Sequence, residues 1–123
     1  MLYVKTYLDK SSIQGIGVFA DEFIPKDTLV WAMHDLDMMI EKQYFNALPE
    51  IAQEFIKIHG DWDIQLQKIT MSFDNDKFMN HSFTPNIRFV NQRTFADRDI
   101  QKGEEMTINY YEFDEKAEEK LKL

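Results

Sequence analysis

The sequence predicts a mainly β protein in which many short strands surround one helical insert. Near both ends of the chain, apolar and polar residues alternate, which is typical of half-buried strands. In the middle and at the C-terminus, apolar residues instead recur at helical spacing. The chain has 123 residues, which is long enough for one domain with its own core. We therefore expect a single domain over residues 1–123, with the helical insert at about 37–60 and a C-terminal tail at 112–123.

The N-terminal third predicts three strands. Alternation over residues 2–8 indicates the first strand, and the apolar stretches 18–20 and 29–33 indicate two short buried strands. Gly15 and Gly17 bracket a tight turn between the first strand and the second.

The middle of the chain predicts helices followed by a strand. Pro49 suits the start of a helix and Gly60 its end, and the apolar residues between them share one helical face. Residues 37–47 predict another short helix. After these helices, alternation returns over residues 64–73 with a slip in phase, which predicts a strand that carries a β-bulge.

The C-terminal third predicts a hairpin, a last strand and a short helix. Residues 87–90 and 94–96 form the two strands of the hairpin. On the last strand, Met106, Ile108 and Tyr110 share the more apolar face, so Tyr110 should point towards the core. A tail helix is predicted by three apolar residues at helical spacing, namely Phe113, Ala117 and Leu121.

Composition and charge narrow the classes of function. The chain has no cysteine, so it has neither a disulfide framework nor a thiolate metal site. No apolar run approaches the roughly 20 residues that cross a bilayer, and no secretory pattern opens the chain. We therefore expect a soluble, intracellular protein. The formal net charge of −8 disfavours nucleic acid as a partner and permits a basic one, although plain solubility also explains it.

One polar loop carries the strongest functional signal. Residues 80–86 read N-H-S-F-T-P-N, and Pro85 favours an extended conformation for the residue before it, so the segment is a shaped loop. His81 suggests a metal ligand or a general base, and Ser82 suggests a nucleophile. No second histidine or acidic pair lies at ligand spacing, and no glycine elbow surrounds Ser82. We therefore expect neither a metal site nor a serine nucleophile.

Three segments, taken in order, resemble the motifs of the SET-domain protein lysine methyltransferases. Residues 12–20, SIQGIGVFA, resemble the first glycine-rich box of that family. Residues 78–86, FMNHSFTPN, resemble its R-F-x-N-H-S-x-x-P-N box, with Lys77 where arginine is common. Residues 103–110, GEEMTINY, resemble its G-E-E-L-T-x-x-Y box. The resemblance covers nearly the whole chain, and three boxes in order form a strong signal.

The resemblance implies both a fold and an activity. The family fold is β-clip-like, with small sheets and a pseudoknot in which the last box threads beneath the N-H-S loop. The activity is transfer of methyl groups from S-adenosyl-L-methionine to a lysine amine of a protein substrate, such as a histone or another basic protein, in the cytoplasm or nucleus. Tyr110 is implied as the catalytic residue. The implied cofactor-binding residues are Gly15, Ile16, Gly17, Asn80, His81, Tyr110 and Phe113, although Phe113 is equally well explained as an anchor of the tail helix.

The resemblance also implies a channel for the substrate lysine. In the family, a hydroxyl near the amine holds a water that blocks further methylation, whereas phenylalanine leaves room. The corresponding positions here are Phe89 and Ile108, and neither carries a hydroxyl. This favours di- or trimethylation. Tyr44, in the insert, could supply a channel hydroxyl and reverse that expectation.

The chain departs from many histone-directed members because no cysteine-rich segment follows its last box. The tail at 112–123 would then complete the lysine channel, or a second subunit would complete it in a homodimer. Two functions stay open: an active methyltransferase, and a catalytically inactive SET fold that binds a basic peptide or partner. Intact Tyr110, Asn80 and both glycines favour the first.

Overall fold

The computed structural model describes all 123 residues. The first half of the chain contains β1 (Thr6–Lys10), β2 (Ile16–Ala20), β3 (Leu29–Ala32), β4 (Met38–Glu41), the 3₁₀ helix η1 (Lys42–Ala47) and α1 (Glu50–His59). The second half contains β5 (Asp61–Asp63), β6 (Lys68–Met71), the 3₁₀ helix η2 (Asn75–Phe78), β7 (Asn80–His81), β8 (Ile87–Val90), β9 (Arg93–Ala96), β10 (Glu105–Ile108), the 3₁₀ helix η3 (Tyr110–Glu112) and α2 (Ala117–Leu121).

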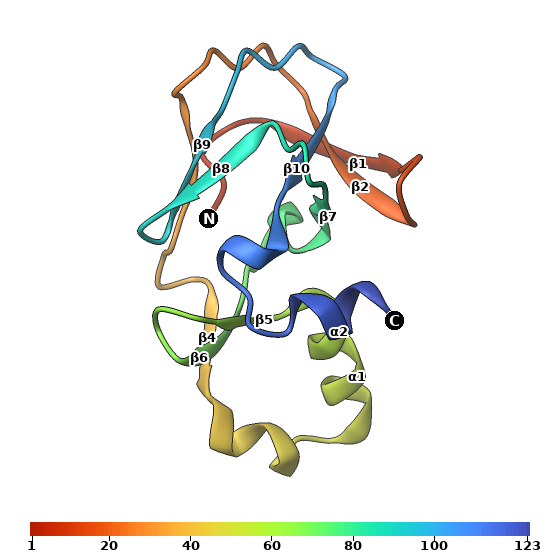
Figure 1. Ribbon diagram of the computed structural model, residues 1–123, viewed down its shortest axis with the longest axis vertical. Coiled ribbons are helices and arrows are strands. Elements are labelled where there is room, and N and C mark those ends of the chain that lie inside the picture. Colours follow the sequence, from red (N-terminus) through yellow and green to blue (C-terminus); the bar gives the residue numbers. More distant parts are fainter.

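The strands form three small sheets, so the fold is mainly β as predicted (Figure 1). One sheet has the strand order β1-β2-β10-β7, and a second has the order β3-β9-β8. We call these two sheets the strand core. The third sheet, β4-β6-β5, lies with η1 and α1 at the lower end of Figure 1, and we call this region, residues 38–71, the insert.

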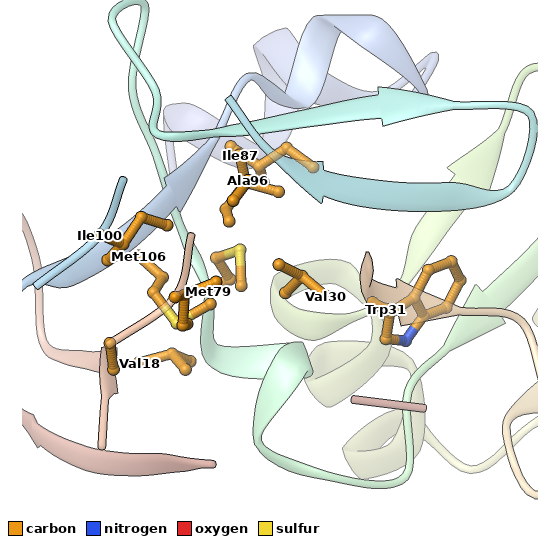
Figure 2. Close-up of a cluster of buried hydrophobic side chains, with 11 residues drawn as sticks. Val18, Val30, Trp31, Met79, Ile87, Ala96, Ile100 and Met106 are labelled. Atoms are coloured by element: carbon orange, nitrogen blue, oxygen red, sulfur yellow. The ribbon is translucent and has the colours of Figure 1, made fainter. Parts of the chain in front are cut away.

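Each region has its own hydrophobic cluster. Eleven buried residues fill the strand core. Figure 2 shows them converging from several strands, with Val18 on β2, Ile87 on β8, Ala96 on β9 and Met106 on β10. The insert has a much smaller cluster of three buried residues, namely Ile56, Trp62 and Ile69.

The N-H-S loop is bound to β10 along its length. β7 and β10 are the only parallel neighbours among the sheets, and they pair Asn80 with Thr107. At the far end of the loop, the Asn86 amide donates to the Glu105 carbonyl over 2.9 Å, while the Thr107 N–H donates to Asn86 Oδ1 over 2.9 Å. Between them, the Ser82 N–H donates to the Ile108 carbonyl over 3.1 Å. These bonds satisfy buried backbone groups that a loop would otherwise leave unpaired.

The structure corrects the prediction of one bulged strand over residues 64–73. The segment belongs to a hairpin of β5 and β6, and the apparent phase slip is its turn. Asp63 Oδ1 accepts the N–H groups of Gln65 and Leu66, which stabilises the turn, and Gln67 adopts a positive φ of 53°. The register shift occurs elsewhere, between β3 and β9.

Three other predicted elements differ in extent or type. Residues 37–47 form β4 and then a 3₁₀ helix, because pairing with β6 outweighs the local helical pattern. The first strand begins at Thr6, and Leu2 makes only an isolated bridge to Trp31. Tyr110 lies in η3 after the last strand and not within it. No helix is long and apolar enough to cross a membrane.

Candidate active site

A surface groove of about 600 Å³ collects residues from all three sequence motifs. Gly15 and Ile16 come from the glycine-rich turn, Asn80 and His81 from β7, and Tyr110 from η3. Five predicted cofactor residues therefore line one groove although they lie up to 95 positions apart in the sequence. We call it the groove.

Asn80 ties the glycine-rich turn to the last strand. Its side-chain amide lies 3.0 Å from the Gln14 carbonyl, 3.3 Å from the Ile16 carbonyl and 3.0 Å from Glu105 Oε2. The Glu105 carboxylate also accepts from the Ser11 hydroxyl at 2.8 and 2.9 Å. A charged acceptor strengthens such bonds, so Glu105 fixes both sides of the turn.

The two glycines near the groove have different roles. Gly15 has a φ of +50°, a conformation that side-chain-bearing residues rarely adopt, and no atom lies within 4 Å of the position of a Cβ. Gly17 does not line the groove. A Cβ at Gly17 would lie 2.4 Å from Glu105 Oε2, so a larger residue there would displace the carboxylate that holds the turn.

The backbone of Tyr110 holds the imidazole ring of His81 in place. Its Nδ1 accepts the Tyr110 N–H over 3.1 Å, and burial lowers the pKa of the imidazole. The neutral ring therefore carries its proton on Nε2, which is buried and has no hydrogen-bond partner. Such an unpaired buried donor is a group that a ligand could satisfy.

Tyr110 lies at the boundary between the groove and an interior cavity of about 50 Å³. Its hydroxyl donates to the Met79 carbonyl over 2.5 Å. Burial raises the pKa of the Tyr110 phenol to about 12, so the side chain is a neutral phenol at physiological pH. It is the one predicted cofactor residue that lines both spaces.

The cavity has an apolar wall and a charged wall. Phe89, Ile108 and Phe113 line it beside Tyr110. The Phe113 ring lies 5.2 Å from that of Phe89 and 6.2 Å from that of Tyr110, measured between centroids. Phe113 thus lies on the cavity side of Tyr110 and not in the groove. The charged wall contains Asp61, Asp76 and Lys120.

The comparison with known families decides what this arrangement belongs to. The family model described as SET domain matches residues 15–111. The chain belongs to the SET-domain family.

Two curated proteins, each named histone-lysine N-methyltransferase, H3 lysine-36 specific, are similar to this SET domain. The Mycosarcoma maydis protein is 27% identical over 119 residues, which cover 88% of this chain and 12% of that protein. The Cryptococcus neoformans protein is 29% identical over 108 residues, which cover 79% of this chain and 13% of that protein. The chain therefore spans about an eighth of the length of these relatives.

Solved structures show the same fold. A chain from Plasmodium falciparum, named as a candidate histone methyltransferase, aligns with a TM-score of 0.64 at 22% identity, covering 89% of this chain and 95% of that one. A chain of the apo ctPRC2 structure with substitutions in Ezh2 aligns with a TM-score of 0.71 at 18% identity, covering 96% of this SET domain and 16% of that chain. At these identities, the likeness concerns the fold alone.

Sequence reasoning did not predict some residues of the site, and one residue that it did predict lies outside both the groove and the cavity. Tyr44, predicted in the lysine channel, is on η1 and 56% exposed, and it lines neither the groove nor the cavity. Glu105 lies inside the G-E-E box, which was its only sequence signal. No sequence signal indicated Asp61, Asp114 or Lys120, because these residues meet only in the folded SET domain.

Proposed function

We propose that this SET domain is an S-adenosyl-L-methionine-dependent protein-lysine N-methyltransferase. The observation that carries the proposal is the place of Tyr110, whose side chain lines both the groove and the cavity. A methyl donor in the groove and a lysine amine in the cavity would meet at this phenol. Alignment of two reactants accounts for a large part of many catalysed transfers.

The residues of the groove fit such a cofactor. Its volume of about 600 Å³ lies in the range typical of sites for small ligands and cofactors. The space beside Gly15 allows a ligand to approach the backbone closely, and His81 Nε2 is a donor without a partner. When bound, S-adenosylmethionine supplies an electrophilic methyl group on a positively charged sulfur. Asn80 acts on the groove through the turn that it holds in place.

Tyr110 and Met79 supply oxygen atoms at the junction. The phenol O–H of Tyr110 donates to the Met79 carbonyl, so the lone pairs of the phenol oxygen remain able to accept weak hydrogen bonds from a polarised methyl group. Fixed dipoles of this kind need no reorganisation during the reaction. On the other side, Phe89 and Ile108 offer apolar contacts that disfavour a charged amine, which must lose its proton to attack. Neither residue has a hydroxyl, and we propose di- or trimethylation on this ground.

The substrate is proposed to be a basic protein. The formal net charge of −8 steers lysine- and arginine-rich partners towards the enzyme. The two fungal relatives are named for histone H3, which makes histone H3 the first substrate to test.

The test compares Tyr110→Phe with the matched control Tyr3→Phe, since Tyr3 is 50% exposed and lies outside both spaces. We expect the rate of methyl transfer to histone H3 to fall about 100-fold or more in Tyr110→Phe, as when one stabilising group is removed from an active site. Cofactor binding measured by calorimetry should remain. Labelled cofactor and mass spectrometry of the product give the rate and the methylation state.

Three results would overturn parts of the proposal. Full activity in Tyr110→Phe would remove Tyr110 from the catalytic role. Failure of the unmodified protein to bind S-adenosylmethionine would exclude the enzyme and favour the inactive SET fold that binds a basic partner. A product restricted to monomethyl-lysine would contradict the methylation state.

A further inference from the structure

Lys120 places an ammonium group inside the proposed active site. It belongs to α2, yet its side chain is only 7% exposed and lines both the groove and the cavity. Its Nζ lies 4.9 Å from the centroid of the Tyr110 ring. A lysine amine therefore already lies against the residue proposed to receive the substrate lysine.

Two carboxylates hold this ammonium group. Lys120 Nζ lies 2.7 Å from Asp61 Oδ1, at the start of β5, and 2.5 Å from Asp114 Oδ2, in the tail. The Asp114 side chain is fully buried, and that of Asp61 is 29% exposed. Together the carboxylates raise the pKa of Lys120, so the group is a cation and not a nucleophile at physiological pH.

Asp114 is held in place independently of Lys120. Its Oδ1 accepts the backbone N–H of Trp62 over 3.1 Å and that of Lys116 over 2.9 Å, leaving Oδ2 for a cation. A carboxylate that backbone donors fix keeps its position when the cation leaves. With the face of the Tyr110 ring, the two carboxylates form a box of the kind that binds alkylammonium groups.

The inference rests on the proposed function. We propose that Asp61 and Asp114 form the ammonium-binding subsite of the lysine cavity, that Lys120 fills this subsite in the resting chain, and that a substrate lysine enters by displacing Lys120. The chemical class that the subsite takes is a primary alkylammonium ion, the form in which a substrate lysine enters. The amine loses this proton only after it leaves the two carboxylates for the apolar contacts of Phe89 and Ile108 beside Tyr110. Lys120 then acts as an internal competitor on the C-terminal helix.

The chain offers a matched control on the same helix. Lys122 lies two residues further on, its side chain is 72% exposed, and its one ion pair is the exposed contact with Glu118. Exposed pairs of this kind contribute little to stability. Replacing Lys122 therefore removes a positive charge from the C-terminal segment without touching the subsite.

The first experiment tests the subsite without any need for activity. Lys120→Ala vacates the space of a propylammonium chain, because alanine keeps the Cβ, and thermal unfolding is followed with n-propylammonium chloride at constant ionic strength. We expect propylammonium to raise the melting temperature of Lys120→Ala and n-propanol to leave it unchanged. The double variant Asp61→Asn/Lys120→Ala should lose the response. No rise, or an equal rise with n-propanol, would overturn the subsite.

The second experiment tests competition with a substrate. If Lys120 fills the subsite about 90% of the time, it raises the KM for a protein substrate about tenfold. Lys120→Met should therefore lower the KM for histone H3 by up to about that factor with kcat maintained, while Lys122→Met leaves both unchanged. An unchanged or higher KM in folded Lys120→Met would overturn the displacement.

A measurement on the unmodified chain covers the case in which Lys120→Met does not fold. Acetic anhydride labels exposed lysines, so Lys120 should react more slowly than Lys122. Saturating histone H3 with S-adenosylhomocysteine should raise the labelling of Lys120 relative to Lys122, and the absence of a rise would exclude displacement. Propylammonium binding without methylation of histone H3 would count against the proposed activity on that substrate and not against the subsite.

Discussion

The strand core and the insert are held together in different ways. Eleven buried residues, most of them on strands of its two sheets, fill the strand core, whereas the insert has a cluster of three. On α1, Ile51, Phe55 and Ile58 remain substantially exposed, and Ile56 is its only buried residue. Polar contacts between the insert and the C-terminal tail supplement this small core, including the pair of Lys42 with Glu115 and the box around Lys120.

This difference explains where the site can be rigid and where it can move. Asn80, His81 and Tyr110 are attached to strands or turns of the strand core, where packing fixes their positions. Asp61 and Lys120 come from the insert and the tail, whose contacts are fewer and more polar. Regions with few buried apolar contacts open more readily than the rest of a fold. Under the proposed function, the strand core would align the two reactants, and the insert and tail would control the entry of the substrate lysine.

The largest expected effect tests this difference in packing directly. Ile87 and Ile69 are both fully buried, one in the strand core and one in the insert. Burial of an isoleucine typically contributes about 2–5 kcal/mol relative to alanine, and the cost falls where neighbours can relax into the cavity. Ile87→Ala should lie near the upper end and Ile69→Ala near the lower end, as measured by urea unfolding. Equal costs, or the reverse order, would contradict the comparison.

A smaller effect is expected at the bond between the N-H-S loop and β10. Asn86→Ala leaves the buried Thr107 N–H and the Glu105 carbonyl without their side-chain partner. Unfolding should become easier by about 1–3 kcal/mol, the usual cost of an unsatisfied buried polar group. The exposed Asn46→Ala, in the insert, is the control and should change stability by less than about 0.5 kcal/mol. A cost for Asn86→Ala no greater than that of the control would show that the loop does not depend on this contact.

The smallest expected effect concerns the contact between the strand core and residues 72–78, the segment that follows the insert. Trp31 Nε1 donates to Ser72 Oγ, which donates to Asp76 Oδ2 over 2.7 Å. Burial of the carboxyl group raises the pKa of Asp76 from 3.8 to about 7. Because the folded chain binds this proton more tightly, the associated stability is complete below about pH 4 and is lost as the pH rises through about 7.

Asp76→Asn removes this ionisation. The stability of the variant relative to the unmodified protein should therefore grow as the pH is raised from 5 to 8. The gain should be on the order of 1 kcal/mol, since Asp76 as a whole is partly exposed and solvent screens its charge. Urea midpoints at several pH values measure it. Asp35→Asn makes the same change in net charge on the exposed surface and serves as the control. A gain that does not grow with pH would exclude Asp76 as the titrating group.

Local patterns predicted the elements that depend on local chemistry. The helix between Pro49 and Gly60 and the hairpin over residues 87–96 appear as expected, since their boundaries are set by turn residues and side-chain spacing. The hairpin of β5 and β6 was missed because Asp63 makes its turn through a side chain, which alternation does not reveal. The place of Tyr110 in a 3₁₀ turn was also missed, since apolar alternation continues past the end of β10.

The sequence by itself determined the family, the mainly β fold and the three motifs, because each depends on residues that are close together in the chain. Only the tertiary structure decided which distant residues meet. Ser11 and Glu105 are 94 positions apart, and Asp61 and Lys120 are 59 positions apart, yet each pair lies within hydrogen-bond distance. No local propensity encodes such contacts, because they form only when the burial of the whole chain brings their segments together.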